Sequence, residues 1–370
     1  MKILHCHSTF SLGGKEARCV RLMNLFGDRA EHLILSAVTG ALTARDAIDR
    51  GVRASFPGEA APSLSGKPSL GRYNRLSRYM ADFDLVLTYN WGSMDAVGAH
   101  RIFSRFRSLP PLIHHEDGFN QDETAKLNPK RNGFRRLMLP TAQMLVVPSQ
   151  RLERIARDVW KQPADRLARI PNGIDVDRYT VAPAPAAIAG LIRAPGEVIV
   201  GTVAGLRPVK NLPRLVRAVA ALPDHVRLVI VGEGPEAQTI MAEAARLNIS
   251  ARVHLAGFMA DPQYYIGAFD IFALSSDSEQ FPISLVEAMA AALPAVSTDV
   301  GDVRAMVSAA NRPYIVAAGD EPNYAAALAK LVDDAPLRRS IGTQNQALAQ
   351  AEYGEAAMLA KYAVLYGIAM

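Results

Sequence analysis

The stretch "SEQFPISLVEAMAAALP", Ser278 to Pro294, places two acids around a helix that is otherwise apolar. Pro282 stands where the helix would begin, and from Ile283 to Leu293 every residue is apolar or small except Glu287. A helix that is apolar on nearly all sides is normally buried, and a buried carboxylate is costly unless a partner satisfies it. Glu279, eight residues before Glu287, lies at the mouth of the same helix. The stretch therefore predicts a buried helix with one acid inside it and one at its entrance.

Short apolar runs alternate with helical stretches along the whole chain. Runs of Val, Ile and Leu that are nearly continuous are typical of strands covered on both faces, as in parallel sheets. Helical segments between such strands predict repeated βαβ units and an α/β fold. The expected strands are "KILHCHSTF", "HLILSAV", "DLVLTYN", "PPLIHH" and "QMLVVPS" in the first half, and "EVIVGTVAG", "RLVIVGEG", "RVHLAG", "DIFALSS" and "PAVSTDV" in the second.

The chain of 370 residues is long enough for two domains. Residues 181–196 read "VAPAPAAIAGLIRAPG", and this segment rich in Pro and Ala is the expected linker. It divides a Rossmann-like domain at 1–180 from a second one at 197–353, and a final helix is expected at 354–370. In open α/β sheets ligands bind at the carboxyl ends of the strands, so two such sheets facing across a cleft would hold the chemistry in the loops that follow strands.

The charge of the chain is mildly basic, with a formal net charge of +5. Lys126, Lys130, Arg131, Arg135 and Arg136 lie close together with no acid among them. A solvated helix face is the simpler interpretation, and a seat for an anionic membrane or a lipid-linked substrate is the alternative. No nucleic-acid motif and no basic stripe interleaved with aromatic residues occurs, so nucleic acid is not an expected partner.

The N-terminal segment and the cysteines favour a cytoplasmic protein that is at most peripheral to the inner face of the membrane. No run of about 18 uncharged apolar residues predicts a membrane span, and "MKILHCHSTF" resembles a first strand more than a signal peptide. Cys6 and Cys19 have no Cys-x-x-Cys spacing and no matching set of histidines in the sequence. Two buried free thiols in a reducing cytosol are therefore expected.

Loops after strands in the first half carry glycine, histidine and acidic residues. Gly13 and Gly14 precede a helix, where backbone can approach an anionic ligand, although many strand–helix turns contain glycine only for geometry. His114 and His115 are adjacent in extended backbone, so they point to opposite sides and are poorly placed to bind one metal together. One of them is expected to face the cleft, with Glu116 or Asp117 to orient it. A strand-end histidine held by local hydrogen bonds explains the pair equally well. Asn90 and Trp91 follow another strand and are expected to line the same side.

Loops in the second half offer cations and turns that suit a diphosphate. Arg207 and Lys210 follow Gly205 at the start of a helix, and two cations beside a helix N-terminus are a favourable seat for a diphosphate. Surface charge is the simpler interpretation if this loop is taken alone. Gly232 opens a turn after the next strand, and the backbone near Phe258 is expected to contact the edge of a base.

Four motifs in order carry a family resemblance over essentially the whole chain: "PNGID" at 171–175, "GLRPVKN", "VGEGPE" and "SEQFPISLVEAMAAALPAVSTDVGD". They resemble the retaining, nucleotide-sugar-dependent glycosyltransferases of the GT-B architecture, group 1 or family 4. The hallmark of that family is Glu-x7-Glu, here Glu279 and Glu287, and "GGKE" resembles its early Gly-Gly loop. The resemblance implies two Rossmann-like domains and a C-terminal helix that returns to the first of them.

The resemblance also implies roles for single residues. Arg207 and Lys210 would grip the diphosphate of the donor, Glu279 would hold hydroxyls of the transferred sugar, and Glu287 would bind the ribose. His114 would be the catalytic histidine of the cleft, with His115 as the second choice. The implied donor-binding set is Gly13, Gly14, Gly205, Gly232, Phe258, Phe281, Pro282, Ile283, Ser284, Leu285 and Glu287, and the implied acceptor-side set is His115, Glu116, Asn90 and Trp91.

Metal-independent catalysis with no cofactor is expected. A glycosyl–phosphate bond breaks while negative charge grows on the diphosphate, and Lys, Arg and a helix N-terminus can stabilise that charge in place of a metal ion. The "DVD" of Asp175 to Asp177 belongs to a turn beside the expected linker and is interpreted as structural. Three positions depart from the family pattern: Gln280, which would narrow the sugar pocket, Ala292 and Asp302.

Two other function classes stay open. A nucleotide-sugar epimerase shares this architecture, although no convincing acid–base set for the sugar can be assigned. A non-catalytic sugar- or nucleotide-binding protein is the second alternative, although Lys210 and Glu279 are both present. A dehydrogenase is disfavoured, because no Gly-x-Gly-x-x-Gly joins a strand to a helix ahead of a ribose-binding acid. The expected acceptor is a growing cell-surface polysaccharide or a lipid-linked glycan at the cytoplasmic membrane face.

Overall fold

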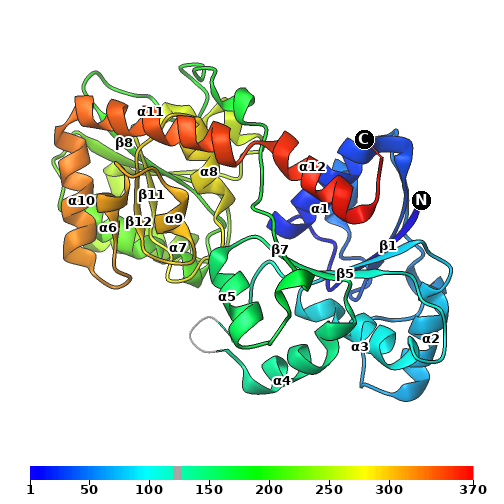
Figure 1. Cartoon of the computed structure of the whole chain (residues 1–370). Coiled ribbons are helices and arrows are strands. Elements are labelled where there is room, and N and C mark those ends of the chain that lie inside the picture. Colours follow the sequence, from blue (N-terminus) through cyan, green and yellow to red (C-terminus); the bar gives the residue numbers. More distant parts are fainter. Residues whose placement is uncertain (120–122, 124–126, 370) are drawn as a thin grey trace. The chain divides into compact units, whose positions relative to one another are not determined.

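The computed structural model describes residues 1–119, 123 and 127–369 of the chain. They form two compact units: the first is Met1–Asn172 together with the residues from Met358 onward, and the second is Gly173–Ala357. Each unit is a sheet covered by helices (Figure 1). All strand pairs between the named strands of the described residues are parallel, as the apolar runs predicted.

The sheet of the first unit has seven strands in the order β3-β2-β1-β4-β5-β6-β7. The strands are β1 (Lys2–His7), β2 (Glu31–Ser36), β3 (Arg53–Ser55), β4 (Leu85–Tyr89), β5 (Leu112–His115), β6 (Met144–Val147) and β7 (Leu167–Arg169). The α-helices that accompany them are α1 (Gly14–Phe26), α2 (Leu70–Met80), α3 (Met94–Phe103), α4 (Pro129–Met138), α5 (Gln150–Asp158) and most of α12 (Glu355–Tyr366).

The sheet of the second unit has six strands in the order β10-β9-β8-β11-β12-β13. The strands are β8 (Val198–Val203), β9 (Val226–Val231), β10 (Val253–Gly257), β11 (Ile271–Leu274), β12 (Ala295–Thr298) and β13 (Ile315–Val316). The α-helices of this unit are α6 (Leu212–Ala220), α7 (Ala237–Arg246), α8 (Ile283–Ala290), α9 (Val303–Met306), α10 (Glu321–Asp333) and α11 (Ala335–Glu352).

Side chains of the first sheet alternate between two apolar cores. Ile3 of β1 belongs to a core that α1 and α12 cover, and that core includes Cys19 and Tyr362. Leu4 and Cys6 belong to the core on the opposite face, which α2, α3 and α5 cover. The period of two along a strand explains the division. Both cysteines are buried and free, as the sequence predicted.

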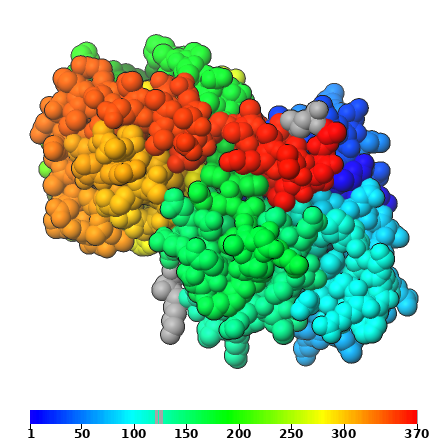
Figure 2. All heavy atoms as spheres, viewed as in Figure 1, coloured from blue at the N-terminus to red at the C-terminus, as the bar shows by residue number. Residues whose placement is uncertain are grey.

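The second sheet is divided in the same way. Val198 and Val200 of β8 pack with α6, α7 and α10, whereas Ile199 packs with α8 and α9 and with Ala349 of α11. In the space-filling view α10 and α11, in orange to orange-red, form a continuous surface of this unit (Figure 2). Because α6 and α8 belong to the two different cores, α8 is buried against the face of the sheet opposite α6.

The ten predicted strands are all present, and the sequence missed three more. β3, β7 and β13 contain three, three and two residues and lie at the sheet edges. A strand of two or three residues is too short to give a recognisable apolar run. Among the described residues, no helix combines the length and the apolar character that crossing a membrane requires.

The expected linker at 181–196 belongs to the second unit, which begins at Gly173. Ile188 is 3% exposed within its core, and the ring Nε2 of His254 hydrogen-bonds to the carbonyl of Ala189 at 2.8 Å. The division between the units thus falls a few residues before the predicted end of the first domain. The residues from Met358 onward join the first unit, a return that the family resemblance implied.

Candidate active site

The loops after β8 and β11 meet at the carboxyl edge of the second sheet. The strand order runs outward in both directions from this neighbouring pair, and open α/β sheets bind ligands at such a switch point. The hydroxyl of Ser275 donates to the carbonyl of Lys210 at 2.9 Å, and the backbone N–H of Asp277 donates to the carbonyl of Val209 at 2.8 Å. These two bonds hold the loops together.

Lys210 and Glu279 form the charged centre of this switch point. Lys210 Nζ lies 2.5 Å from Glu279 Oε1, and the hydroxyl of Ser276 donates to the same oxygen at 2.7 Å. The two charged side chains keep 23% and 12% of their exposure. The pair therefore presents a cation and a carboxylate that a ligand can reach.

Arg207, the second predicted cation, lies on the same loop and is exposed. Its backbone is extended just before the turn Pro208–Lys210, and Asn211 follows in the left-handed region with φ 42°. The side-chain amide of Asn211 donates to the carboxylate of Asp277 at 3.1 Å. The structure thus brings Arg207 and Lys210 onto one turn that is anchored to the loop after β11.

Two glycines allow the loops around this site to pack closely. A Cβ on Gly232, whose φ is 142°, would lie 1.9 Å from the carbonyl oxygen of Ala204. A Cβ on Gly301, whose φ is 60°, would lie 2.5 Å from the carbonyl oxygen of Glu279. Gly205 is less constrained, with Arg207 Nε 3.4 Å from such an atom. Gly232 therefore has a packing role, and its contact with a donor stays a prediction.

The start of α8 lies next to Glu279 in the chain. Pro282 precedes the helix, and no side chain caps its first turn. The N–H of Leu285 donates to the carbonyl of Pro282 at 3.2 Å, so that amide is partly used within the turn. An uncapped helix N-terminus carries partial positive charge and favours anions. Of the amides predicted to bind phosphate, those of Ile283 and Ser284 suit the role best.

Glu287 lies on α8 and contacts Tyr179. The Tyr179 hydroxyl donates to Glu287 Oε1 at 3.2 Å. Burial raises the pKa of Glu287 to about 7, and the hydrogen bond from Tyr179 acts in the opposite direction. Near neutral pH the carboxyl therefore populates both protonation states. Sequence reasoning missed Tyr179, since a single tyrosine four residues after "PNGID" gives no signal of its own.

Phe281 and Phe258 have partners within the second unit, whereas the side-chain oxygen of Gln280 has none among the described residues. The Phe281 ring packs edge-on against Tyr353, with 5.6 Å between ring centroids. The backbone N–H of Phe258, predicted to read a base edge, donates to Glu233 Oε1 at 3.3 Å, while the Phe258 ring is 63% exposed. The side-chain oxygen of Gln280 is buried, and no described residue hydrogen-bonds to it. The exposed ring is the part of Phe258 that remains available to a base.

In the first unit the loop after β1 leads into α1. The helix begins at Gly14, Gly13 is extended, and no side chain caps the first turn. A Cβ on Gly14 would meet no described atom within 4 Å, whereas one on Gly13 would lie 3.1 Å from Glu16 Oε2. The open space at Gly14 leaves room for a ligand. Donor contact at either glycine stays a prediction.

His114 and His115 point to opposite faces of β5, as their alternation predicted. His114 Nδ1 lies 2.8 Å from Thr88 Oγ1, whereas His115 Nε2 lies 2.8 Å from the hydroxyl of Tyr366. Both side chains are buried, with 0% and 1% exposure. The catalytic role of His114 and the acceptor-side role of His115 stay predictions, since each ring has its partners in the interior.

The basic segment of the first unit is partly turned inward, unlike a uniformly solvated face. Arg135 is fully buried, with its Nε 3.0 Å from Glu116 Oε2, and Arg131 pairs with Glu123 at 2.9 Å. The rings of Trp91, Phe119 and Trp160 surround the Arg135 guanidinium at 5.1, 5.5 and 4.9 Å. Lys130 and Arg136 are exposed, and Lys126 lies outside the described residues. Glu116 thus serves as the internal partner of an arginine.

Asn90 and Trp91 follow β4, the neighbour of β1 at the switch point of the first sheet. Asn90 has φ 54°, and its side-chain oxygen accepts a hydrogen bond from the N–H of Asp117 at 2.7 Å. Trp91 lines a pocket of about 530 Å³ with both aromatic and charged walls. The other lining residues include Pro68, Asp95, Lys130, Arg131 and Phe134.

Two protein-family models match the chain, one on each unit. The model "Glycosyl transferases group 1" matches residues 188–347, and the model "Glycosyltransferase Family 4" matches residues 12–178. The chain belongs to the group 1 glycosyltransferases. Together the matched ranges contain the Glu279 and Glu287 motif and the Gly13–Gly14 loop on which the sequence resemblance rested.

Curated relatives of this glycosyltransferase include proteins that act on different acceptors. It is 27% identical over 172 residues to N-acetyl-alpha-D-glucosaminyl L-malate synthase of Bacillus anthracis, a match that covers 46% of this chain and 45% of that protein. It is 28% identical over 280 residues to D-inositol 3-phosphate glycosyltransferase of Nocardia farcinica, covering 70% and 61%. The chain thus spans about half to three fifths of these relatives.

A longer match is to UDP-Gal:alpha-D-GlcNAc-diphosphoundecaprenol alpha-1,3-galactosyltransferase of Escherichia coli. The two are 25% identical over 323 residues, which is 81% of this chain and 79% of that protein.

Solved structures similar to the glycosyltransferase establish its GT-B fold. HepE of Anabaena in complex with UDP has a TM-score of 0.80 at 21% identity, covering 99% of this chain and 100% of that one. WaaG, a glycosyltransferase involved in lipopolysaccharide biosynthesis, has a TM-score of 0.72 at 17% identity, covering 98% and 99%. Likeness at this level of identity concerns the fold alone.

Proposed function

We propose that this glycosyltransferase moves a sugar from a nucleoside-diphosphate sugar to a glycan or lipid-linked acceptor, with retention at the anomeric carbon and without a required metal ion. The acceptor is proposed to be part of a cell-surface polysaccharide or a related glycan. A relative named for a diphosphoundecaprenol-linked substrate supports this choice of acceptor class.

The observation that carries the proposal is the Lys210–Glu279 contact of 2.5 Å beside the uncapped start of α8. A cation, a carboxylate and a helix N-terminus converge there at the carboxyl edge of the sheet. A sugar diphosphate has matching parts: anionic phosphates for the cation and the amides, and hydroxyls for the carboxylate. The nucleotide then lies toward Glu287 and the exposed Phe258 ring.

In the proposed reaction the bond between the anomeric carbon and the diphosphate oxygen breaks, and its electron pair stays on that oxygen. A bond forms between the anomeric carbon and an acceptor hydroxyl, whose proton passes to the departing diphosphate or to solvent. Lys210, Arg207 and the amides of Ile283 and Ser284 stabilise the charge that grows on the leaving group. These positive and hydrogen-bonding groups stabilise the leaving group, as a divalent cation does in other transferases.

Glu279 and Glu287 are proposed to bind hydroxyls at the two ends of the donor. Glu279 is in contact with Lys210 before the donor binds. When the sugar binds, its hydroxyls replace part of this contact. Glu287 accepts the ribose hydroxyls as a carboxylate. HepE, which shares the fold, was crystallised with UDP, which makes uridine the first base to test.

A thermal-shift panel of UDP, GDP, ADP and CDP, each with and without magnesium, tests the donor. We expect one nucleotide to raise the melting temperature to the same extent in both conditions, because binding to the native state alone stabilises it. Stabilisation by none of the four would contradict the proposal. A shift seen only with magnesium would contradict metal independence.

Glu279→Ala separates catalysis from binding. We expect this variant to lose donor hydrolysis and transfer while the nucleotide still stabilises it. Full activity of the variant would remove Glu279 from the proposed site. The configuration of the product, read from the coupling constant of its anomeric proton, tests retention.

Contact with an anionic membrane is proposed to involve Lys130 and Arg136, the exposed members of the basic segment. Co-sedimentation with anionic and neutral vesicles at physiological salt tests it. We expect preference for anionic vesicles, reduced in a Lys130→Ala/Arg136→Ala double variant. Equal binding to both vesicle types would reject the membrane contact and leave the transferase proposal intact.

A further inference from the structure

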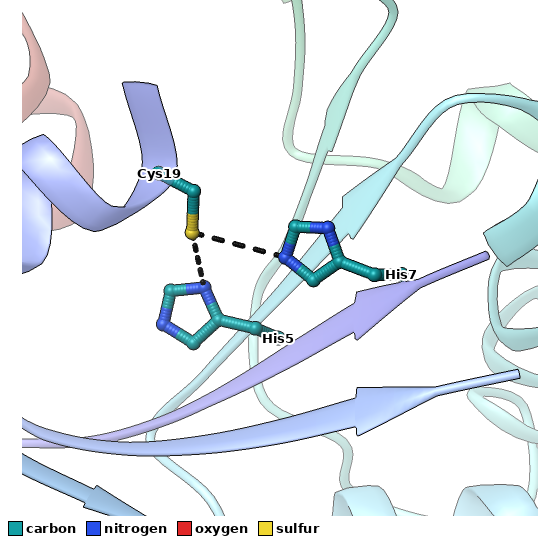
Figure 3. Close-up of side chains that lie close together, drawn as sticks. All are labelled: His5, His7 and Cys19. Carbon is teal, nitrogen blue, oxygen red and sulfur yellow. Dashed lines mark hydrogen bonds between the residues drawn. The ribbon is translucent and has the colours of Figure 1, made fainter. Parts of the chain in front are cut away.

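Two histidines of β1 and one cysteine of α1 converge inside the first unit (Figure 3). Cys19 Sγ lies 3.5 Å from His5 Nδ1 and 3.8 Å from His7 Nε2. All three ligand atoms lie within 4.8 Å of one another, and the three residues are buried. His5 and His7 share a face of β1 because they are two residues apart. The fold brings Cys19 to them from the helix above.

We propose that His5, His7 and Cys19 bind a zinc ion that fixes α1 on β1. With Zn–S near 2.3 Å and Zn–N near 2.0 to 2.1 Å, a tetrahedral site places sulfur and nitrogen about 3.5 Å apart. The two measured separations, 3.5 and 3.8 Å, are close to this value without any movement of the helix. Two imidazoles and one thiolate are ligands that zinc commonly takes.

Tyr89 lies beside the proposed site. Its hydroxyl lies 3.5 Å from Cys19 Sγ and 3.2 Å from His5 Nδ1, so it faces the same centre. The other ring nitrogen of His5 lies 2.9 Å from His32 Nδ1. Histidines that bind metals usually donate their second N–H to an acceptor, which orients the ring, and His32 Nδ1 can accept here. The site therefore has three strong ligands, a hydroxyl oxygen next to two of them and a support behind one of the imidazoles.

Hydrogen bonding alone satisfies this cluster poorly. The Cys19 thiol has a single proton, yet His5, His7, Tyr89 and the sulfur of Met23 all lie within reach of its sulfur atom. His7 is fully buried, and its Nδ1 has no hydrogen-bond partner among the described residues. Neutral His7 with its proton on Nδ1 directs the lone pair of Nε2 toward the centre. A cation at this centre would be bound by the lone pairs of Cys19 Sγ, His5 Nδ1 and His7 Nε2. Without a cation, these lone pairs point toward one another.

The two cations near the cluster are both paired. Lys15 pairs with Glu16, and Arg18 pairs with Asp117, so each neighbouring positive charge already has a negative partner. On binding, the S–H bond of Cys19 breaks, its proton leaves to solvent, and a zinc–sulfur bond forms with no change of oxidation state. The ligands all belong to the first unit, whereas Lys210 and Glu279 belong to the second. Because all three ligands are buried, the proposed ion is structural.

Metal analysis of the whole chain, prepared without a polyhistidine tag, tests the proposal. We expect about one zinc ion per chain after desalting, released by a strong chelator and restored by added zinc, with a fall in melting temperature between the two states. A chain that retains no zinc, or that takes copper in its place, would overturn the assignment.

Cobalt supplies a signature specific to the ligands. The chelated chain with added Co²⁺ is expected to show thiolate-to-cobalt charge transfer in the near ultraviolet and the strong visible bands of four-coordinate cobalt. The sequence has two cysteines, and Cys6 is the matched control because it is equally buried but faces the opposite core. Cys6→Ala should keep the charge-transfer band and the zinc, whereas Cys19→Ala should lose both.

The cobalt spectrum of Cys6→Ala decides the question even if Cys19→Ala fails to fold, because only one thiol then remains. Absence of charge transfer in that variant, or its persistence in a folded Cys19→Ala chain, would overturn the proposal.

Discussion

The two units of the molecule have the same sheet geometry, but the residues at their strand ends differ in burial and charge. In the first, His7, Tyr89 and His115 end neighbouring strands and are buried, with 0%, 2% and 1% exposure. In the second, Lys210 and Glu279 follow β8 and β11 and remain partly exposed. Burial lowers the pKa of His7 and His115, so these rings are neutral near pH 7. The same edge of the same fold thus becomes a sealed neutral cluster in one unit and an open charged site in the other.

The difference teaches that position in a fold does not by itself identify a site. A group that binds a substrate must stay reachable, and Lys210 keeps 23% of its side-chain exposure. A group enclosed with its partners instead contributes to stability or holds a small ion. Variants that disturb the enclosed groups should therefore change stability, and variants of the open groups should change activity.

The largest expected effect concerns Arg135, the most enclosed charge of the first unit. Arg135→Ala removes the partner of Glu116 and leaves that carboxylate buried, which costs about 3 to 5 kcal/mol for a broken internal pair. Urea unfolding of the whole chain measures the loss in the free energy of unfolding. Its neighbour Arg136 is exposed and is the matched control, with an expected change within about 0.5 kcal/mol for Arg136→Ala. Equal midpoints for the two variants would show that the comparison fails in this unit.

Lys210→Ala tests the open site. Removal of one group that stabilises leaving-group charge is expected to lower kcat by about 10² to 10³ fold. Unfolding stability should change less than in Arg135→Ala, because Lys210 and Glu279 keep 23% and 12% of their exposure whereas Arg135 and Glu116 keep none. Lys330→Ala, an exposed lysine of the same unit, is the control for loss of a positive charge. Unchanged turnover of the Lys210 variant would refute its proposed role.

Glu287 lies between the two extremes, since it belongs to the open site but is largely enclosed. With a pKa of about 7, its ionised fraction rises between pH 6 and pH 8. Because ribose hydroxyls bind the carboxylate form, affinity for the donor should rise about tenfold over this interval. Calorimetry measures this affinity. An intact sugar nucleotide is the ligand, because it has no terminal phosphate whose own titration would add to the pH dependence. Glu287→Gln should bind more weakly and lose the pH dependence, and a slope retained by this variant would assign the titration to another group.

The smallest expected effect lies just after α8. Ala292 adopts φ 56°, a left-handed conformation that costs a residue with a Cβ about 1 kcal/mol. Ala292→Gly should stabilise the second unit by about 0.5 kcal/mol after the entropy of the unfolded glycine is included. Ala291, with φ −81°, is the control, and Ala291→Gly should destabilise. A melting temperature that falls in both variants would show that strain at Ala292 is absent.

Much of the second unit was predictable from sequence because its motifs are local. Glu279, Glu287, Arg207 and Lys210 lie in short segments whose order and spacing are visible without a fold. The ten main strands were predictable for the same reason, since their apolar runs are continuous.

The first unit was less predictable because its features depend on contacts between distant residues. The partners of Arg135 come from several loops, and nothing in the basic segment distinguishes it from Arg136. Cys19 meets His5 and His7 only after α1 folds onto β1, so the sequence showed two isolated thiols and no histidine set.

The helix α12 has a consequence for the order in which the chain folds. The residues from Met358 onward complete the core that contains Ile3 and Phe26, and the whole second unit separates them in the sequence. During synthesis, strands β1 to β7 therefore leave the ribosome long before Tyr362 and Tyr366 exist to cover that core. Domains usually fold in the order in which they are made. Here the unit that begins first is completed last, after the second unit has been synthesised in full.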